Sequence, residues 1–448
     1  MFANIKTDPS WTFADCTRTQ TRYITHGYHT YPAKFIPQLA ARLIRELSSE
    51  NEIVVDPFMG SGTTIVEAMM QGRIGVGVDI NPVAHLIAHV KATPIEPAAL
   101  EREYAKIAND LEAGARFVNK IVPARDRIGY WFPKKQKERL SILLGRISEV
   151  HDEDARDFFL VAFSQILKSC SIWLQRSIKP TRDLNKTPAD PFDVFRRQAR
   201  YMLKQNRALW DTLPVRVRDN ARAYRTVKCA DARALPVDDD AASLVVTSPP
   251  YVTSYEYADL HQLAALWFEY CESLPEFRKR FIGSASSARA AINLKSDIAE
   301  DICRALGEEK KGREVRNYFA DMLECFIEMR RALRVGGKAC IVIGDTELHG
   351  VKILNAEVFG EQIQNIGFRV HEIIKREIPS KILPQTRDPH SGKFTSSTNA
   401  KKVLAYPVEY ILVMEKVLRD VELAPEESGS SGISGVTTPN TCSNSPSE

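Results

Sequence analysis

A strand, a glycine turn, a helix and a second strand follow one another near the start of this chain. Ile53–Asp56 is apolar and β-branched, and it leads into the turn Asp56-Pro-Phe-Met-Gly-Ser-Gly-Thr-Thr64. Thr63–Gln71 has the pattern of a helix, and Ile74–Val78 has that of a buried strand that ends at Asp79. This order predicts the start of a doubly wound, Rossmann-like α/β sheet.

A helical insertion then interrupts the α/β pattern. From about Pro97 to Asn220 the apolar residues recur at helical spacing, and the polar segment Gln175–Asp190 breaks the run. We interpret this region as an insertion in one crossover of the sheet. The helices expected within it are Ala99–Val122, Lys134–Val150 and Asp154–Gln175.

The α/β pattern resumes at Thr226. The strands expected from there on are Thr226–Cys229, Ser243–Val246, Lys338–Gly344, Val370–Arg376 and Glu409–Glu415. The expected helices are Tyr318–Leu333, closed by a C-cap turn at Arg334–Gly337, and Ala356–Ile366. The chain therefore divides into a first sheet region (residues 1–91), the helical insertion (92–223), a second sheet region (224–418) and a tail (419–448) whose composition predicts disorder.

The glycine turn has the features of a ligand site. Gly60 and Gly62 permit a tight turn and a close approach of the backbone to a ligand. The helix that follows directs its positive N-terminal end to the same place. The third glycine of the dinucleotide fingerprint and the Walker lysine are missing, which disfavours phosphate-binding cofactors. An ordinary β–α turn is the alternative interpretation.

Two aspartates stand at the ends of other predicted strands. Asp79 follows the second strand, where a carboxylate can accept hydrogen bonds from both hydroxyls of a ribose. Asp231 follows the first strand after the insertion and is placed to meet an adenine amino group. Their order along the chain favours contacts with a nucleotide-like cofactor, and a solvated strand end or a helix cap is the alternative for each.

A second short segment, Ser248-Pro-Pro-Tyr251, follows the strand Ser243–Val246. Two prolines hold their φ angles fixed and donate no backbone hydrogen bond, so the carbonyls of the turn stay available as acceptors. The Ser248 oxygen and the Pro249 carbonyl can therefore hold the two protons of an aromatic amino group, and the Tyr251 ring offers a face for stacking an extruded base. A rigid surface loop is the alternative.

The composition limits the class of protein. The formal net charge is +4, and the tail from Arg419 carries one Arg and five acids, so the rest of the chain carries +8, which is compatible with a polyanionic partner. No apolar run is long enough to cross a membrane and no signal core follows the N-terminus, so we expect a cytoplasmic protein. The eight scattered cysteines form no C-x-x-C pair, which disfavours a zinc site or a disulfide framework.

Together these segments resemble the amino-group DNA methyltransferases that use S-adenosylmethionine. Asp56–Thr64 resembles their motif I, Asp79 their motif II acid, Asp231 their motif III and Ser248–Tyr251 their motif IV. His26–Pro37 resembles motif X, which in that family helps to close over the methionine end of the cofactor. The resemblance covers most of the two predicted sheet regions and implies a Rossmann-like methyltransferase fold.

The resemblance also implies site residues. The contacts with S-adenosylmethionine would come from Tyr31, Pro32, Ala33, Lys34, Phe35, Asp56, Pro57, Phe58, Gly60, Ser61, Gly62, Thr63, Asp79, Ile80, Asp231, Ala232 and Thr247. The base would be held by Ser248, Pro249, Pro250 and Tyr251, and no metal ligand is implied.

A threonine and a serine at the head of motif IV are typical of cytosine-N4 members, whereas adenine-N6 members more often have Asp or Asn there. We therefore expect methyl transfer to N4 of a flipped cytosine in double-stranded DNA. The setting would be a restriction-modification system, with a cognate restriction endonuclease that acts on the same site. The alternatives are an adenine-N6 DNA methyltransferase, an RNA base amino methyltransferase and a non-catalytic DNA-binding protein.

Three segments are candidates for reading the DNA sequence, and a solvated basic face is the alternative for each. One is the insertion, with Arg176, Lys179, Arg182, Lys186, Arg196, Arg197 and Arg200. The others are Val252–Arg316, which follows motif IV, and the polar segment Lys375–Lys402.

Overall fold

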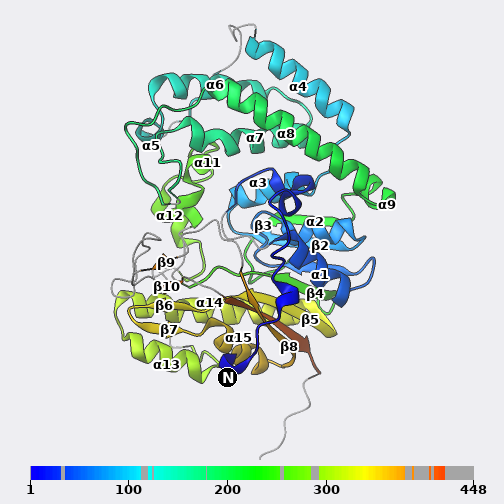
Figure 1. Ribbon diagram of the computed structural model, residues 1–448, viewed down its shortest axis with the longest axis vertical. Coiled ribbons are helices and arrows are strands. Elements are labelled where there is room, and N and C mark those ends of the chain that lie inside the picture. The colour runs from blue at the N-terminus through cyan, green and yellow to red at the C-terminus, as the bar shows by residue number, and fades with distance from the viewer. Residues whose placement is uncertain are drawn as a thin grey trace, which may run out of the picture. The chain divides into compact units, whose positions relative to one another are not determined.

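A seven-stranded, mostly parallel sheet organises the chain (Figure 1). The computed structural model describes residues 2–31, 36–112, 120–123, 126–177, 179–252, 257–283, 292–378, 386–387, 403–404 and 408–418. The sheet contains, in spatial order, β3 (Arg225–Cys229), β2 (Ile74–Asp79), β1 (Ile53–Asp56), β4 (Ala242–Thr247), β5 (Leu333–Ile343), β11 (Val408–Lys416) and β8 (Phe368–Glu377). Strand β11 is antiparallel to β5 and β8, and the other neighbours are parallel. This topology confirms the expected doubly wound α/β fold.

Helices surround this sheet and build the insertion. Those of the two sheet regions are α1 (Pro37–Leu47), α2 (Thr63–Met70), α3 (Pro82–Lys91), α10 (Tyr257–Leu260), α11 (Gln262–Trp267), α12 (Leu274–Lys279), α13 (Asp297–Leu306), α14 (Lys310–Ala332) and α15 (Asn355–Gln364). The insertion contains α4 (Pro97–Glu112), α5 (Asp126–Trp131), α6 (Lys134–Ser148), α7 (Glu153–Cys170), α8 (Pro191–Thr212) and α9 (Val215–Asp219). Short 3₁₀ helices are η1 (Phe2–Asn4), η2 (Pro9–Trp11), η3 (Gln20–Arg22) and η4 (Ile24–Gly27), and two short strand pairs are β6 (Thr346–Leu348) with β7 (Val351–Ile353) and β9 (Thr386–Arg387) with β10 (Val403–Leu404).

The order of the strands reverses between β1 and β4, because β1 pairs with β2 on one side and with β4 on the other. Ligands of open α/β sheets bind outside the carboxyl ends of the strands at such a switch point. The glycine turn follows β1 and the Pro-Pro-Tyr segment follows β4. The topology therefore brings the two segments to the same edge of the sheet.

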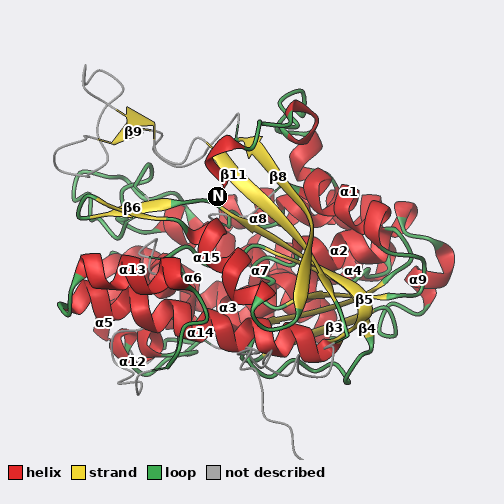
Figure 2. Cartoon of the chain, turned by 90° about the horizontal axis from the view of Figure 1, so that it is seen from below, coloured by secondary structure: helices red, strands yellow, loops and turns green. Residues whose placement is uncertain are grey.

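Alternate residues of the central strands face different helical layers, as the two-residue period of a strand requires. Val54 and Leu244 pack in one core cluster with residues of α1. Their chain neighbours Val55 and Val245 pack in another cluster with residues of α14 and α15. Figure 2 shows α1 and α14 on opposite sides of the twisted sheet. All of these strand residues are fully buried, which explains their unbroken apolar sequence.

Helices α4 to α8 of the insertion share one core cluster with α3 and α11. Polar caps mark where its two longest helices begin. The side chain of Asp152 accepts from the backbone of Ala155 at the start of α7, and Asp190 accepts from Phe192 and Asp193 at the start of α8. In Figure 1 these helices lie above the sheet, and α3 and α11 lie between the two.

Several element boundaries differ from the sequence prediction. Helix α14 begins at Lys310 rather than at residue 318, and it ends at Ala332, where Leu333 is already extended. The segment Arg334–Gly337, predicted as a C-cap turn, lies within strand β5, where Gly336 has a positive φ and the pairing with β4 shifts register. A glycine pair signals a local left-handed residue, which a helix cap and a strand irregularity both use. The helix expected to end at residue 175 ends at Cys170, and the described part of the helix expected over Ala99–Val122 is Pro97–Glu112.

Gly62 connects the turn to the packing of α2 on α3. Its φ is +74°, and a Cβ at this position would lie 2.8 Å from Ala88 Cβ and 3.0 Å from Ala88 Cα. An alanine there would combine a left-handed backbone with a clash against helix α3, and neither can relax without moving a helix.

We expect Gly62→Ala to lower the free energy of unfolding by about 2–4 kcal/mol, the sum of the left-handed strain and the overpacking. Urea denaturation followed by circular dichroism measures this change. The matched control is Gly129→Ala in α5, where a Cβ would meet nothing within 4 Å. Equal stability of the two variants would contradict the packing role of Gly62.

Candidate active site

The carboxylate of Asp56 joins the glycine turn to strand β4. Its Oδ1 accepts from Thr247 Oγ1 at 2.6 Å and from the backbone of Phe58 at 3.1 Å, and its Oδ2 accepts from Thr64 Oγ1 at 2.7 Å. Asp56 is 2% exposed, and burial raises the pKa of its carboxyl to about 6 although the three bonds oppose that shift. Asp56 and Thr247 thus hold together the two segments that the sequence singled out.

The turn itself is fixed by Asp79. Its Oδ2 accepts from the backbone of Gly60 at 3.0 Å, and its Oδ1 accepts from the backbone of Asn81 at 2.8 Å. Burial raises the pKa of the Asp79 carboxyl to about 6. The predicted cofactor residues that keep partial exposure around this point are Phe58, Gly60, Asp79, Ile80 and Asp231, whereas Pro57, Ser61, Gly62, Thr63 and Ala232 are buried.

Thr63 provides a direct test of whether the turn suits the amino-acid end of a cofactor. It is the first residue of α2 and is 4% exposed, and its Oγ1 has no hydrogen-bond partner among the residues that the structure describes. A buried hydroxyl at a helix N-terminus is suited to donate to a carboxylate placed there. The residues present therefore fit the methionine carboxylate of S-adenosylmethionine.

Tyr31 covers the outer side of the turn. A Cβ on Gly60 would lie 3.1 Å from the Tyr31 ring, so only a glycine allows this ring so close. The ring of His261 packs against Tyr31 with centroids 4.9 Å apart, and His261 Nδ1 hydrogen-bonds Asn81 Nδ2 at 2.9 Å. The sequence interpretation identified Tyr31 but missed His261, which carries no local motif and reaches the site only through the fold.

Asp231 also lies at this edge of the sheet, because the Ala230 backbone donates to the Asp79 carbonyl. Its carboxylate accepts from Arg233 Nε at 2.9 Å and from another guanidinium nitrogen of Arg233 at 2.6 Å. Arg233 also pairs with Asp321 of α14 at 3.3 Å. The bond between Asp231 and Arg233 sets the orientation of the carboxylate that was predicted to meet an adenine.

The Pro-Pro-Tyr segment contains acceptors that have no hydrogen-bond partner among the described residues. The Pro250 carbonyl accepts from the Tyr318 hydroxyl at 2.7 Å, which anchors the turn on α14. By contrast, the Ser248 side chain and the Pro249 carbonyl receive no hydrogen bond from the described part of the chain. Ser248 is partly exposed. These are the two acceptors that the sequence assigned to an amino group.

Tyr251 is held by the far strands of the sheet. Its ring packs on Gly344 at the end of β5, where a Cβ would lie 3.3 Å away, and its hydroxyl donates to Glu409 Oε2 at 3.4 Å. Glu409 forms a buried ion pair with Arg376 at 2.7 Å. Neither residue of this pair had a signal in the sequence, because strands β8 and β11 contain charged residues at several positions.

A buried polar network supports the turn from behind. Glu67 of α2 accepts from Tyr23 and contacts His26 Nε2 at 2.7 Å, and Lys91 donates to the Ser61 carbonyl at 2.5 Å. Glu67, His26 and Lys91 are each at most 2% exposed. Burial raises the pKa of the Glu67 carboxyl to about 7, against the opposing effect of Tyr23 and Lys91.

We expect the substitution Glu67→Gln to stabilise the protein increasingly as pH rises from about 4.5 to 7. The folded state keeps the Glu67 proton up to about pH 7, whereas the unfolded state releases it near 4.5. The free energy of unfolding of the wild type therefore falls by up to about 3 kcal/mol over this window. Glutamine does not ionise and escapes that loss. Unfolding free energies measured across this pH range test the difference between the two proteins.

The control is Glu46→Gln, which changes an exposed carboxylate of α1 that pairs only with Arg42 among the residues described. Water solvates that carboxylate in both states, so we expect this variant to change the unfolding free energy little. Parallel profiles for the two variants would contradict the raised pKa of Glu67.

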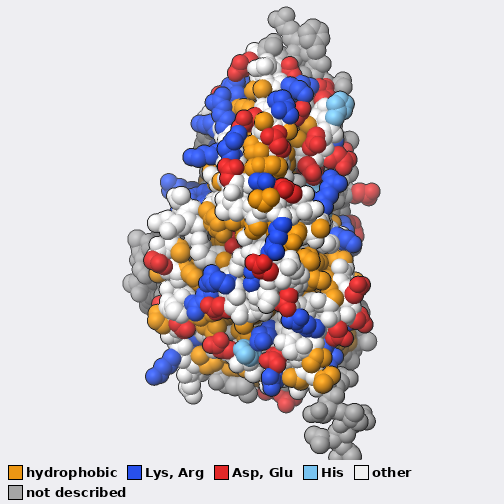
Figure 3. All heavy atoms as spheres, turned by 90° about the vertical axis from the view of Figure 1, so that its right-hand side faces the viewer, with side chains coloured by type: hydrophobic (Ala, Val, Ile, Leu, Met, Phe, Trp, Pro, Cys, Tyr) orange, Lys and Arg blue, Asp and Glu red, His pale blue; other side chains and the backbone are white. Residues whose placement is uncertain are grey.

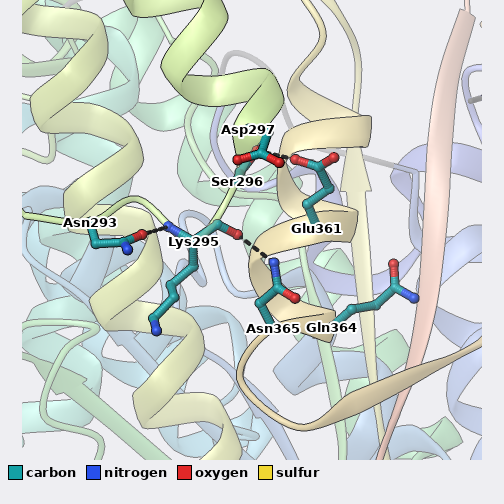
Figure 4. A pocket seen from close by; sticks show the side chains of 7 residues that line it. All are labelled: Asn293, Lys295, Ser296, Asp297, Glu361, Gln364 and Asn365. Carbon is teal, nitrogen blue, oxygen red and sulfur yellow. Dashed lines mark hydrogen bonds between the residues drawn. The ribbon is translucent and has the colours of Figure 1, made fainter. Parts of the chain in front are cut away.

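A polar hollow of about 430 Å³ lies elsewhere on the chain, between the start of α13 and the end of α15 (Figure 4). It is lined by Asn293, Lys295, Ser296, Asp297, Glu361, Gln364 and Asn365, none of which the sequence assigned to the site. Glu361 accepts from Ser296 at 2.5 Å, and Asn365 donates to the Lys295 carbonyl at 3.0 Å. These bonds join two helices and account for the polar lining.

Comparison with known proteins places the chain in a family. The model of the DNA methylase family, which covers adenine-N6 and cytosine-N4 enzymes, matches residues 3–89 and 242–420, more than half of the chain. The chain belongs to this family. The expected membership of the amino-group DNA methyltransferases is thereby confirmed, and S-adenosylmethionine is the methyl donor of these DNA methylases. The two matched segments flank residues 90–241, which include helices α4 to α9.

Several relatives are similar over most or some of the chain. Type II methyltransferase M.MvaI of Kocuria varians is 26% identical over 421 residues, 84% of this chain and 90% of its own length. Type II methyltransferase M.BsoBI of Geobacillus stearothermophilus is 21% identical over 77% of this chain and 78% of its own. DNA adenine methyltransferase YhdJ of Escherichia coli (strain K12) is 37% identical over 62 residues, 14% of this chain and 21% of its own.

Some expectations concern other segments of the chain. Pro32, Ala33, Lys34 and Phe35 of motif X and the tail from residue 419 lie outside the described residues. Within the residues that the structure describes, no helix is long and apolar enough to cross a membrane. No cluster of three or more His, Cys, Asp or Glu side chains that could hold a metal occurs there either.

Proposed function

We propose that this DNA methylase transfers a methyl group from S-adenosylmethionine to N4 of a cytosine flipped out of duplex DNA. One observation carries the proposal: the Ser248 side chain and the Pro249 carbonyl receive no hydrogen bond from the described residues, and the bond between Asp56 and Thr247 holds them beside the cofactor turn. The threonine and serine that begin Thr247-Ser-Pro-Pro-Tyr251 favour cytosine. Adenine N6 is the second candidate, because a segment of the chain is similar to an adenine enzyme.

The residues beside β4 activate the amino group by position and charge. The lone pair of an exocyclic amine is delocalised into the ring, which makes it a weak nucleophile. When the Ser248 hydroxyl and the Pro249 carbonyl accept hydrogen bonds from its two N–H groups, the nitrogen becomes more tetrahedral and its lone pair turns toward the methyl donor. Tyr251 stacks on the base. As the nitrogen forms its bond to the methyl carbon, the bond from that carbon to the donor sulfur would break and leave its electron pair on the sulfur. One amino proton would leave along the hydrogen bond to Ser248 or Pro249 and pass to solvent.

The cofactor would lie across the carboxyl ends of β1, β2 and β3. S-adenosylmethionine, when bound, supplies an electrophilic methyl on a sulfonium centre. Thr63 would donate to its carboxylate, Asp79 would accept from the ribose hydroxyls and Asp231 from the adenine amino group. Tyr31, braced by His261, would cover the methionine end. The substrate base would then face the donor from the β4 side.

The wider setting follows from the relatives. Two of them are Type II methyltransferases, which supports a restriction-modification role and a cognate restriction endonuclease acting on the same site. Cytoplasmic localisation would follow from a genomic DNA substrate. We also propose that the insertion at residues 92–223 contacts DNA, beside the sheet regions at residues 1–91 and 224–418.

Ser248→Ala should lower kcat by about a hundredfold or more and leave the affinity for S-adenosylmethionine unchanged, because the acceptor acts on the base. Tyr318→Phe, which removes the hydrogen bond to the Pro250 carbonyl, should lower kcat about fivefold, since a neutral hydrogen bond contributes about 1 kcal/mol. Single-turnover kinetics and calorimetric cofactor binding measure the two effects. Wild-type kcat in Ser248→Ala would exclude the acceptor role.

Mass spectrometry of nucleosides tests the base assignment. DNA is taken from a methylation-free host that expresses this chain, and the same host with Ser248→Ala is the control. We expect N4-methylcytosine with the wild type only. N6-methyladenine would keep the mechanism and assign the second candidate. If folded protein is present and neither methylated nucleoside is detected, the result would contradict DNA methylation as the activity.

A further inference from the structure

One surface of the insertion combines exposed cations with an aromatic ring. We name it the insertion surface and define it by Arg127, Tyr130, Arg176, Lys179 and Arg182. All five side chains are exposed, and Tyr130 retains 46% of its surface. The Arg182 guanidinium lies 4.2 Å from the centre of the Tyr130 ring, and that of Arg127 lies 5.7 Å from it. The ring thus holds guanidinium groups in place without neutralising them.

The loop that carries three of these cations is held by two lysines. Lys186 Nζ donates to the carbonyls of Lys168 and Trp173 at 2.8 and 2.7 Å, and Lys168 Nζ donates to the Ser177 carbonyl at 2.9 Å. Burial lowers the pKa of both lysines. Trp173 stacks on Trp131 of α5 with centroids 5.0 Å apart. The bonds made by these lysines fix the loop, so the exposed cations are presented on an ordered support.

Charge pairing separates this surface from several arginines of the insertion helices. These arginines pair with acids, as in Arg139–Asp190, Arg146–Asp110, Arg156–Glu153 and Arg196–Asp193. The four cations of the insertion surface form no ion pair with any residue that the structure describes. On the face shown in Figure 3, by contrast, Lys and Arg are interspersed with Asp and Glu.

The insertion surface is joined to the candidate active site through α11. Trp131 Nε1 of α5 donates to Gln262 Oε1 at 3.2 Å, and Phe132 packs edge-on against Trp267. Next to the start of α11 stands His261, whose ring supports Tyr31 over the glycine turn. In Figure 1, α5, α11 and α12 lie near one another on the left of the view. Helix α11 thus connects the insertion surface with the candidate active site.

We propose that the insertion surface binds the sugar–phosphate backbone of the DNA duplex that flanks the target base. This inference rests on the proposed function, which supplies DNA as the partner. Arg and Lys without acidic partners bind phosphates by charge, and each neutralised phosphate releases condensed counterions. Such contacts position the duplex and carry no base sequence information.

The test replaces three exposed cations together in Arg176→Gln, Lys179→Gln, Arg182→Gln. The full chain is titrated with a fluorescein-labelled DNA duplex of mixed sequence at a series of salt concentrations. We expect Kd to rise about tenfold or more, and the slope of log Kd against log salt to fall by about 2–3, close to one for each lost phosphate contact. At saturating DNA kcat should be unchanged, as should the KM for S-adenosylmethionine.

The matched control is Lys6→Gln, Arg18→Gln, Arg45→Gln, which lies outside the insertion and outside the candidate site. These residues are also exposed and without an ion pair to the described residues, and the change in net charge is the same. We expect this variant to keep the wild-type Kd and salt slope. An equal loss of DNA affinity in both triple variants would show an effect of net charge alone and would overturn the proposal. Wild-type DNA affinity in the variant at residues 176, 179 and 182 would also overturn it.

Further measurements distinguish a failure of the insertion-surface assignment from a failure of the proposed function. Melting temperatures show whether the variants are folded. If the triple variant is unstable, the single variant Lys179→Gln replaces it in the titration, and it should lower the salt slope by about 1. Methyl transfer by the wild type to unmethylated plasmid DNA tests the proposed function by itself. If that transfer occurs while the insertion variants bind as the wild type, only the surface assignment fails. Stronger, loop-dependent binding of an RNA duplex would overturn DNA as the partner.

Discussion

The site depends on one buried carboxylate, that of Asp56. Its two oxygens accept from Thr64, Thr247 and the backbone of Phe58, and these bonds offset the cost of taking a carboxyl group out of water. The donors come from the turn after β1 and from the end of β4, which is the strand across the switch point. The cofactor turn and the base-binding segment therefore keep a fixed relative position, which the transfer of a single carbon atom requires.

The remaining support comes from elements far away in the chain. Tyr318 of α14 fixes the Pro250 carbonyl, and the ion pair between Glu409 and Arg376 holds the Tyr251 hydroxyl. His261 supports the ring over the glycine turn from the opposite side. A site whose acceptors are placed in advance does not have to order them during the reaction. The helical insertion adds to this support because it packs on α11.

Much of the fold followed from local patterns. Strands β1 and β4 are continuous apolar runs because helices cover both faces of the sheet, and such runs are recognisable in a sequence. The prediction for Arg334–Gly337 was wrong, since a Gly-Gly pair after a helix indicates a cap as well as a strand irregularity. Helix α8 was not distinguished from its surroundings, although Asp190 caps it. The support residues Glu409 and His261 were missed, because a contact between distant segments leaves no spacing to detect.

The sequence by itself determined the order of strands and helices, the glycine turn and the two prolines, because each of these depends on the conformational limits of a few adjacent residues. It also determined the family, since the motifs lie in the right order. Only the tertiary structure decided that the Pro250 carbonyl accepts a hydrogen bond from Tyr318, while the Ser248 side chain and the Pro249 carbonyl receive none from the described residues. It also decided which surface arginines are neutralised by acids. The contact between Tyr318 and Pro250 joins separate elements of the chain, as do ion pairs such as Arg139–Asp190, and packing sets those distances.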